Sequence, residues 1–591
     1  MTERKDDPEA PWNKPPQPIK ELWIIEAPGK ARVLHEALKR LGMEARVFAT
    51  KGHLMSFPDR LTPVGIDARL REVERKAIDP ARVVRMRAEA ASAARVVVAT
   101  DADQEGDVIA WDVADILSDI HPSPLRVRLR GMDDESILQA ADEGGPVLIE
   151  DAVPGRTRAI LDRLIGATYS RNGIAVGRVG TAILGLFRPG QPDGKDVPTT
   201  MRLRLCAPAA DNGKPWMADT SVQQPLDAAM AERLRELQLP RLSKRGGEPG
   251  RRLPGHTGDI LARAADVLDL SPGETMRSLQ RSYESGRMSY PRSGSRGISE
   301  TVSQRLDDML RKAGQKFDSD AMARKTGSDV HDAPHPIGPP PNLSISPTRM
   351  DVDESVRAVV AGDLVRAGQV HVIEEPDTTP LAGFLEGRGF PTMVIELVLS
   401  LRWRREQGPR YPGQQAWGQS ETFERHPAAV LMERVVETKL GRPSTWASQV
   451  DGFLSRGLVD SELALTAKGI KWMEASPVPL LDFRISAAIE RACTNMSLAK
   501  GDPEALPWEN MAMSILGILA RTPLKDEVMA TAALLPSGNR IDPWAGMRQP
   551  MDVPSLEDGP ENTAKVYKSD PNPEVEADAP RPPDSMFPGE L

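Results

Sequence analysis

The sequence predicts a multidomain protein that begins with an α/β domain and continues in largely helical parts. At 591 residues, the chain is too long for one ordinary hydrophobic core. Up to about residue 145, short apolar runs alternate with amphipathic segments, a pattern typical of a mainly parallel sheet covered by helices. Most of the remaining chain is polar with helical periodicity, and its end is rich in proline and acidic residues.

The α/β domain is expected over residues 20–150. The runs LWIIEA (22–27), ARVFAT (45–50), RVVVAT (95–100) and RVRLRG (126–131) predict strands. Between the first two, residues 29–42 place leucines and alanines on one side of a helix. Ligands of such sheets gather at the carboxyl ends of the strands.

Four carboxylates follow the third predicted strand within seven residues: Asp101, Asp103, Glu105 and Asp107. Acidic residues are favoured in the first turn of a helix, and a helix is predicted to begin here. Alternatively, residues 101, 103 and 105 of an extended chain point the same way and offer the hard oxygen ligands that Mg²⁺ prefers. Glu26 ends a different strand at the same edge of the sheet, which helix capping does not explain.

Composition excludes several classes of protein. Only two cysteines occur, Cys206 and Cys493, so neither a disulfide framework nor a Cys₄ zinc ribbon is expected. No apolar stretch approaches membrane-spanning length, and the first 17 residues lack the apolar core of a signal peptide. We expect a soluble, cytoplasmic protein without zinc.

The net charge of −9 is concentrated at the end of the chain. Residues 542–591 hold eleven acidic and four basic residues, which leaves about −2 for everything before them. We expect residues 541–591 to form a disordered acidic tail. Because the rest of the chain is nearly neutral, basic patches on it remain possible, and the total charge does not decide the partner.

A well-signalled helix precedes a short extended segment in the middle of the chain. Ser271 and Glu274 form a predicted capping box with proline at the first helical position, and Gly286 supplies the end signal. The sequence then reads RMSYPR, in which proline moves Tyr290 out of the helical region. Tyr290 and Arg292 are therefore expected on one face of an extended segment.

A second helical block runs from about 428 to 535 and is interrupted by GRPST (441–445). Ser444 or Thr445 could be an ordinary N-cap of the helix that follows. Trp446, next in the chain, is expected in the core rather than as a platform for stacking bases.

Taken in order, these segments resemble the motifs of type IA DNA topoisomerases. IIEAPGKA carries the Glu that ends the first strand of the family's TOPRIM domain, KGHL follows at 51–54, and DADQEGDVIAW matches DxDREGExIAW. RAILDRLIG (158–166) leads to GRVGT (177–181), MSYPRSGS resembles the nucleophile segment ITYPRTDS, HDAPHP (331–336) resembles HEAIRP, and GRPST is unaltered. The resemblance spans roughly residues 22–500.

The chain departs from the family pattern at several positions. Gln104 stands in place of Arg, Asp107 in place of Glu, Gly180 in place of a common Gln, and Gly294 in place of Asp. The histidine motif is degenerate, so His335 could take the place of His331. These differences bring the efficiency of the enzyme into question, whereas the acidic residues and the tyrosine are intact.

The resemblance implies a TOPRIM domain followed by a toroidal topoisomerase core. The core is expected over 151–540, with helical DNA-binding parts at 151–197 and 428–540 and a Tyr-bearing domain at 253–374. A β-rich arch is expected from 198–252 and 375–425, where TMRLRLCA and TMVIELVLSLRW look strand-like.

The resemblance also implies an ATP-independent isomerase that changes DNA topology through a 5′-phosphotyrosine intermediate. Tyr290 would be the nucleophile, Arg292 and Lys30 would hold the scissile phosphate, and Glu26 would act as general acid and base. Asp101, Asp103, Glu105 and Glu26 would hold Mg²⁺. The residues expected to contact DNA are His53, Arg158, Arg178, His331, Arg442, Ser444 and Thr445.

Two other functions remain open from the sequence. Another TOPRIM phosphotransfer enzyme, a nuclease or a primase, would share the acidic residues but has no reason to keep the Tyr-Pro-Arg and GRPST segments. A catalytically weakened, DNA-binding relative would account for Gln104 and Gly294. For the topoisomerase we expect a monomer that prefers single-stranded segments of DNA; whether relaxation or decatenation dominates stays open.

Overall fold

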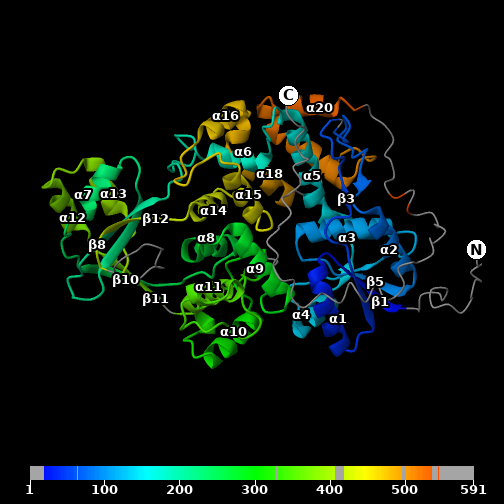
Figure 1. The fold of residues 1–591 in the computed structure, drawn as a ribbon, viewed down its shortest axis with the longest axis horizontal. Helices are drawn as coiled ribbons and strands as arrows, with labels where there is room; N and C mark the ends of the chain where they lie inside the picture. The colour runs from blue at the N-terminus through cyan, green and yellow to red at the C-terminus, as the bar shows by residue number, and fades with distance from the viewer. Residues whose placement is uncertain are drawn as a thin grey trace, which may run out of the picture. The chain divides into compact units, whose positions relative to one another are not determined.

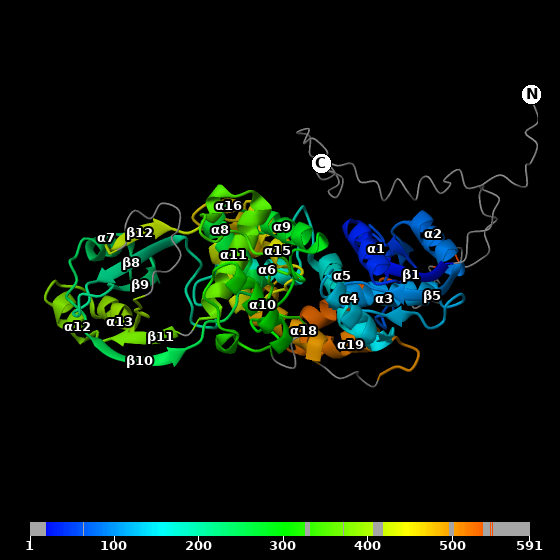
Figure 2. The ribbon, with the colours of Figure 1, turned by 90° about the horizontal axis from the view of Figure 1, so that it is seen from below.

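A computed structural model describes residues 19–62, 64–325, 331–369, 371–405, 418–495, 501–535, 544 and 547. The chain divides into two compact units, which are described separately (Figures 1 and 2). The first unit contains residues 1–177 and 491–591, and the second contains residues 178–490. Across the described ranges, no helix combines the length and the apolar character that a membrane span needs.

The first unit is built on the predicted parallel sheet. Its strands are β1 (Ile19–Ile25), β2 (Ala45–Ala49), β5 (Ala93–Val98), β6 (Leu125–Arg126) and β7 (Gly145–Pro146), in the order β2-β1-β5-β6-β7. The first four are mutually parallel and β7 is antiparallel. The mixed α/β class and the mainly parallel sheet are therefore confirmed, although RVRLRG contributes only its first residue to β6.

Helices cover this sheet and extend the unit. They are α1 (Ala31–Arg40), α2 (Pro80–Ala91), α3 (Gln104–Ile116), α4 (Asp134–Asp142) and α5 (Ile149–Tyr169), with η2 (Pro28–Lys30) before α1 and a small hairpin of β3 (Met55–Ser56) and β4 (Lys76–Ala77). From the far end of the chain come α19 (Pro507–Leu516), η5 (Ile518–Arg521) and α20 (Leu524–Ala532). Helix α5 packs against α3, α19 and α20. The structure thus groups residues 151–177 with the α/β domain, where we had expected the helical core to begin.

The end of the chain also contributes to the core of the first unit. Trp544 is buried in the cluster that contains Leu22 and Val98 of the sheet and Ile109 of α3. Its indole N–H donates a hydrogen bond to the Asp115 carboxylate at 2.6 Å. The expected acidic tail therefore cannot begin at 541; apart from Trp544 and Met547, the residues of 541–591 lie outside the described part of the chain.

The second unit is mainly helical. Its helices are α6 (Arg178–Gly185), α7 (Ala228–Arg235), α8 (Thr257–Leu268), α9 (Pro272–Glu284), α10 (Glu300–Lys312), α11 (Val352–Ala367), α12 (Thr379–Glu386), α13 (Thr392–Ser400), α14 (Pro427–Glu437), α15 (Trp446–Ser455), α16 (Ala467–Ala475) and α17 (Val478–Leu481), with the short η3 (Ser319–Ala321) and η4 (Pro347–Arg349). Helix α18 (Phe483–Asn495) crosses the boundary between the units. The capping box predicted from Ser271 and Glu274 begins α9, which is confirmed.

Two small sheets complete the second unit, in the region expected to form the arch. Strands β8 (Met201–Ala207), β9 (Trp216–Ser221) and β12 (Glu421–Glu424) form one sheet, and β10 (Lys244–Gly250) pairs with β11 (His371–Pro376) in the other. The strand predicted from TMRLRLCA is confirmed as β8. The strand predicted from TMVIELVLSLRW is wrong, because residues 392–400 form helix α13 after Pro391 at its N-cap. A short continuous apolar run does not distinguish a buried strand from a helix, and here Val394 and Val398, one helical turn apart, reach the core.

Candidate active site

The carboxyl ends of β1 and β5 carry the first part of the predicted site. Glu26 follows β1, and the neighbouring strand β5 leads into Asp101. Lys30 ends the 3₁₀ turn after Glu26; its ammonium group is buried and forms an ion pair with the buried Asp101 carboxylate. The KGHL segment lies alongside, since the Gly52 N–H donates a hydrogen bond to the Glu26 carbonyl at 3.2 Å. The fold therefore brings Glu26 and Asp101 to one edge of the sheet, as predicted, and Lys30 lies beside them.

Asp103 and Glu105 occupy the start of α3. The Asp103 carboxylate is the N-cap of this helix and accepts a hydrogen bond from the Gly106 N–H at 2.8 Å. Glu105 lies in the first turn, 3.0 Å from the Nε2 atom of His53. Burial favours the neutral His53 ring, but the hydrogen bond and the charge of Glu105 outweigh it and raise the pKa of His53. Helix capping therefore explains part of this acidic run, and His53, expected to contact DNA, lies beside the run.

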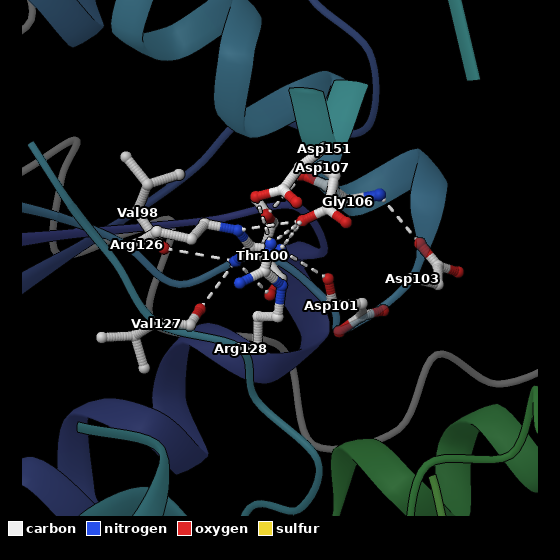
Figure 3. Close-up of polar contacts among 10 residues, drawn as sticks. All are labelled: Val98, Thr100, Asp101, Asp103, Gly106, Asp107, Arg126, Val127, Arg128 and Asp151. Carbon is white, nitrogen blue, oxygen red and sulfur yellow. Dashed lines mark hydrogen bonds and ion pairs between the residues drawn. The ribbon is translucent and has the colours of Figure 1, made fainter. Parts of the chain in front are cut away.

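The fourth carboxylate has a structural partner. Asp107 binds Arg126 at 2.9 Å and Arg128 at 3.0 Å, and Arg128 also binds Asp151 at 2.7 Å (Figure 3). Arg126 is buried and donates hydrogen bonds to the carbonyls of Thr100 and Asp101 at 2.9 Å each. Arg126 thus fixes the backbone from which the acidic residues project, and Arg128 joins Asp107 to Asp151 of α5.

Arg126 and Arg128 were not predicted from the sequence as supports of the site. Their signal was the alternation of arginine with apolar residues in RVRLRG, which places several bases on one side of an extended segment. Gly106 was missed as well. A Cβ at this position would overlap the carbonyl oxygen of Asp101, so the close turn between β5 and α3 requires glycine.

The donors at this edge suit a hard divalent cation. Among the residues that the structure describes, no three His, Cys, Asp or Glu side chains converge closely enough to form a metal site. The carboxylates of Glu26, Asp101, Asp103 and Glu105 nevertheless supply only oxygen donors, at the ends of two adjacent parallel strands. The chemistry of this donor set fits Mg²⁺, and a metal would compete with Lys30 for Asp101.

The predicted nucleophile lies in the second unit. Tyr290 is buried, with its ring centroid 4.4 Å from that of His331 and 5.5 Å from that of Tyr283 on α9. The Ser289 N–H donates to the His335 carbonyl at 2.9 Å, and the His335 N–H donates to the Ser289 hydroxyl at the same distance. The degenerate histidine motif therefore runs beside the tyrosine segment; His331 contacts the tyrosine ring, and the His335 backbone holds the neighbouring residue.

Helix α8 fixes the chain on both sides of Arg292. The hydroxyl of Thr257, the first residue of the helix, donates to the Pro291 carbonyl at 2.6 Å. The Thr257 N–H donates to the Ser293 carbonyl at 3.0 Å, and the Ser293 N–H donates to the Thr257 hydroxyl at 2.8 Å. Tyr290 and Arg292 are consequently held on a defined, non-helical backbone.

The GRPST and GRVGT segments meet around one acidic side chain. Arg178 lies 3.3 Å from Glu490, and Arg442 lies 3.6 Å from the same carboxylate. A Cβ on Gly441 would lie 3.7 Å from Val179, and one on Gly294 would lie 3.6 Å from Pro443. Three motifs that are far apart in the sequence therefore come together in the second unit.

The remaining predicted residues are placed as follows. The Thr445 hydroxyl accepts from the Arg442 N–H at 3.1 Å and so closes the GRPST turn on itself, with Ser444 half-buried inside it. Trp446 is buried, in agreement with its expected place in the core. Arg158 lies instead in the first unit, buried on α5, where it donates to the Thr494 hydroxyl at 3.2 Å.

Comparison with known proteins identifies the fold. Residues 21–130 match the Toprim domain family. The chain is 22% identical over 543 residues to DNA topoisomerase 1 of Aquifex aeolicus, which covers 83% of this chain and 98% of that protein. It is 25% identical over 289 residues to reverse gyrase 2 of Aeropyrum pernix, covering 47% of this chain and only 22% of that longer protein. The solved structure of full-length topoisomerase I from Thermotoga maritima superposes with a TM-score of 0.53 at 17% identity, over 85% of this chain and 90% of that one.

Proposed function

We propose that this chain, a member of the type IA topoisomerase family, cuts one DNA strand with Tyr290, passes a strand through the break and reseals it without ATP. The observation that carries this proposal is the setting of Tyr290 in the second unit. Its ring lies against His331 on an extended segment that adjoins the GRPST turn, and GRPST in turn adjoins GRVGT. A nuclease or primase that used only the acidic edge of the first unit would need none of these three segments together.

In the proposed reaction, the Tyr290 oxygen forms a bond to phosphorus and the bond from phosphorus to the 3′-oxygen breaks. The tyrosine hydroxyl gives its proton to solvent water, and Glu26 gives a proton to the departing 3′-oxygen. Religation reverses both transfers, so the energy of the cleaved bond is kept in the phosphotyrosine.

Basic side chains would hold the scissile phosphate during this exchange. Arg292, two residues after Tyr290, offers a guanidinium group that can bind two phosphate oxygens. Lys30 is a second candidate, and it would have to exchange its ion pair with Asp101 for the phosphate. Asp101, Asp103, Glu105 and Glu26 would hold Mg²⁺, which when bound neutralises charge near the cut ends and orients them.

DNA is proposed to bind mainly as a single strand, with Arg178 and Arg442 contacting phosphates. Both arginines lie beside Glu490, which offsets part of their charge. Each phosphate contact should contribute about 0.7 to the slope of log affinity against log salt. We further propose that the protein works as a cytoplasmic monomer.

A plasmid assay tests the proposed function. The full chain is incubated with negatively supercoiled plasmid and Mg²⁺ without ATP, and the reaction is stopped with detergent. Relaxed circles together with protein-linked nicked circles would support the topoisomerase. Protein-free nicked or linear plasmid would identify a nuclease, and unchanged plasmid that is nevertheless bound would identify the DNA-binding relative.

A further inference from the structure

The first turn of α8 contacts two motifs of the proposed site, although none of its residues was assigned to catalysis, metal or DNA. Residues 256–259 read His-Thr-Gly-Asp, and the helix begins with a capping box between His256 and Asp259. A capping box needs only the residues at its two ends. The helix start therefore does not explain why Thr257 and Gly258 lie between them.

Thr257 is fully buried against the tyrosine segment. Its hydroxyl lies within 2.8 Å of three backbone groups, which are the carbonyls of Pro291 and Ser293 and the Ser293 N–H. These groups stand on either side of Arg292, whose side chain is half-buried. One hydroxyl therefore fixes the backbone on both sides of the arginine proposed to hold the scissile phosphate.

The same turn also contacts both sides of GRPST (441–445). The His256 ring centroid lies 5.4 Å from that of Trp446, the residue that follows this motif. A Cβ on Gly258 would lie 2.5 Å from the Val436 side chain of α14, which precedes the motif, and 3.3 Å from the Trp446 ring. Glycine at 258 thus allows α8 to approach α14 closely.

Asp259 holds the tyrosine segment at a second point. Its carboxylate binds the Arg296 guanidinium with both oxygens, at 2.7 and 2.8 Å. Burial acts to raise the pKa of Asp259, but the hydrogen bonds from His256 and Arg296 outweigh it and lower the pKa. The carboxylate is therefore charged at neutral pH, and the chain after Tyr290 is held at residue 296 as well as beside Arg292.

We propose that Thr257 is a positioning residue for DNA cleavage, whose hydroxyl holds the Arg292 backbone so that the guanidinium group meets the scissile phosphate. The rest of the turn keeps GRPST in a fixed position relative to the tyrosine segment. This inference rests on the proposed function and adds a residue that would act through the backbone, without contacting DNA. A displacement of about 1 Å at a reacting group costs on the order of 100-fold in rate, so the loss of this anchor should slow cleavage.

Single-turnover cleavage of a single-stranded oligonucleotide, measured as detergent-stable adduct, tests the proposal. Thr257→Val keeps the shape of the side chain but lacks the hydroxyl, and it should form the adduct about tenfold or more slowly, with oligonucleotide affinity within about threefold of the original. Thr257→Ser keeps the hydroxyl and should restore most of the rate. Thr438→Val is the matched control, because the buried Thr438 hydroxyl donates to the Arg434 carbonyl of its own helix at 2.7 Å, and its rate should be unchanged.

Hydrogen exchange followed by mass spectrometry measures the positioning without the reaction. The peptide that contains Ser293 should exchange about fivefold faster in Thr257→Val, as expected for the loss of one hydrogen bond, and as before in Thr438→Val. Peptides of the first unit should exchange at the original rate in every variant, which shows that the variants fold.

Three results would overturn the proposal. They are unchanged exchange of the Ser293 peptide in Thr257→Val, unchanged cleavage by this variant, and a loss of cleavage in Thr257→Ser equal to that in Thr257→Val. Absence of any adduct with the unmodified protein would instead contradict the proposed function. Faster exchange in Thr257→Val would in that case still show that the Thr257 hydroxyl orders the tyrosine segment.

Discussion

Asp103 has one demonstrated role in the fold and one proposed role in the chemistry. It caps α3 through the Gly106 N–H, and it belongs to the carboxylates proposed to hold Mg²⁺. The two roles respond differently to substitution, because an asparagine side chain caps a helix about as well as aspartate but lacks the charge that binds a metal.

Asp103→Asn is therefore expected to leave the free energy of unfolding within about 0.5 kcal/mol of the original, whereas Asp103→Ala should lose about 1 kcal/mol. Both variants should need more Mg²⁺ for plasmid relaxation. Asp133→Asn is the matched control, since Asp133 caps α4 through the Ser136 N–H at 3.1 Å and lies outside the proposed metal site. Normal plasmid relaxation by Asp103→Asn at limiting Mg²⁺ would show that Asp103 caps α3 but does not bind the metal.

Asp112 should make stability depend on pH. It is buried in α3, lies 3.1 Å from Arg156, and burial raises its pKa to about 6. Because this pKa lies above that of an unfolded aspartate, the folded state binds the extra proton. The resulting stabilisation is complete below about pH 4 and is lost as the pH rises through 6.

Asp112→Asn lacks this titration, so its stability relative to the unmodified protein should rise between pH 4 and 7. The expected change is on the order of 2 kcal/mol. Urea unfolding of both proteins at several pH values measures it. A constant difference, or one that changes in the opposite direction, would show that the arginines keep Asp112 charged throughout.

At the scale of single elements, α6 contains two glycines with opposite constraints. A Cβ on Gly185 would overlap the backbone carbonyl of Leu481 on α17, so this glycine allows two helices to approach closely. Gly180 stands where the family commonly has Gln, and a Cβ there would meet only the end of the Arg456 side chain, at 3.5 Å.

Gly185→Ala should therefore destabilise the protein by roughly 1–3 kcal/mol through overpacking. Gly180→Ala should be neutral or stabilise it by up to about 1 kcal/mol, because alanine favours the helix. Thermal unfolding of the two variants compares them within one element. Equal effects would mean that the contact between α6 and α17 is not as tight as the structure has it.

The elements also show which parts of the fold and the site can be predicted from the sequence. Periodicity and turn signals were sufficient for the parallel sheet, for α9 with its capping box and for β8. They failed at α13, where an apolar run has no period that separates strand from helix. The residues of the site were recognisable by motif, but Arg126 and Arg128 were not, since their role depends on a tertiary contact with Asp107 that no local pattern encodes.

At the scale of the whole chain, segments far apart in sequence build each unit. The first unit takes α19, α20 and Trp544 from the end of the chain, and composition alone had assigned residue 544 to a tail. A single tryptophan in an acidic, proline-rich stretch is a weak signal, because its burial depends on a core formed more than 400 residues earlier.

Trp544→Ala should lower the free energy of unfolding of the first unit by about 3 kcal/mol, as expected for loss of a buried tryptophan. Trp544→Phe keeps most of the packing and loses the hydrogen bond to Asp115, so it should cost about 1 kcal/mol. Chemical unfolding followed by near-ultraviolet circular dichroism tests the pair. If neither variant changes stability, the tryptophan does not belong to the core.

The proposed function depends on the covalent intermediate. Tyr290→Phe keeps the ring that packs against His331 and Tyr283, so it should fold and bind single-stranded DNA without forming a detergent-stable adduct. Tyr283→Phe is the matched control, a buried tyrosine inside α9 whose hydroxyl has no role in the proposed reaction, and it should still form the adduct.

Peptide mapping of the adduct formed by the unmodified protein is the most direct test. The protein is trapped on DNA with detergent in the presence of Mg²⁺, digested, and the peptide that carries the 5′-phosphate is sequenced. We expect this phosphate on Tyr290. A phosphate on Tyr169, Tyr283, Tyr411 or Tyr567, or no adduct at all under conditions where the protein binds DNA, would contradict it.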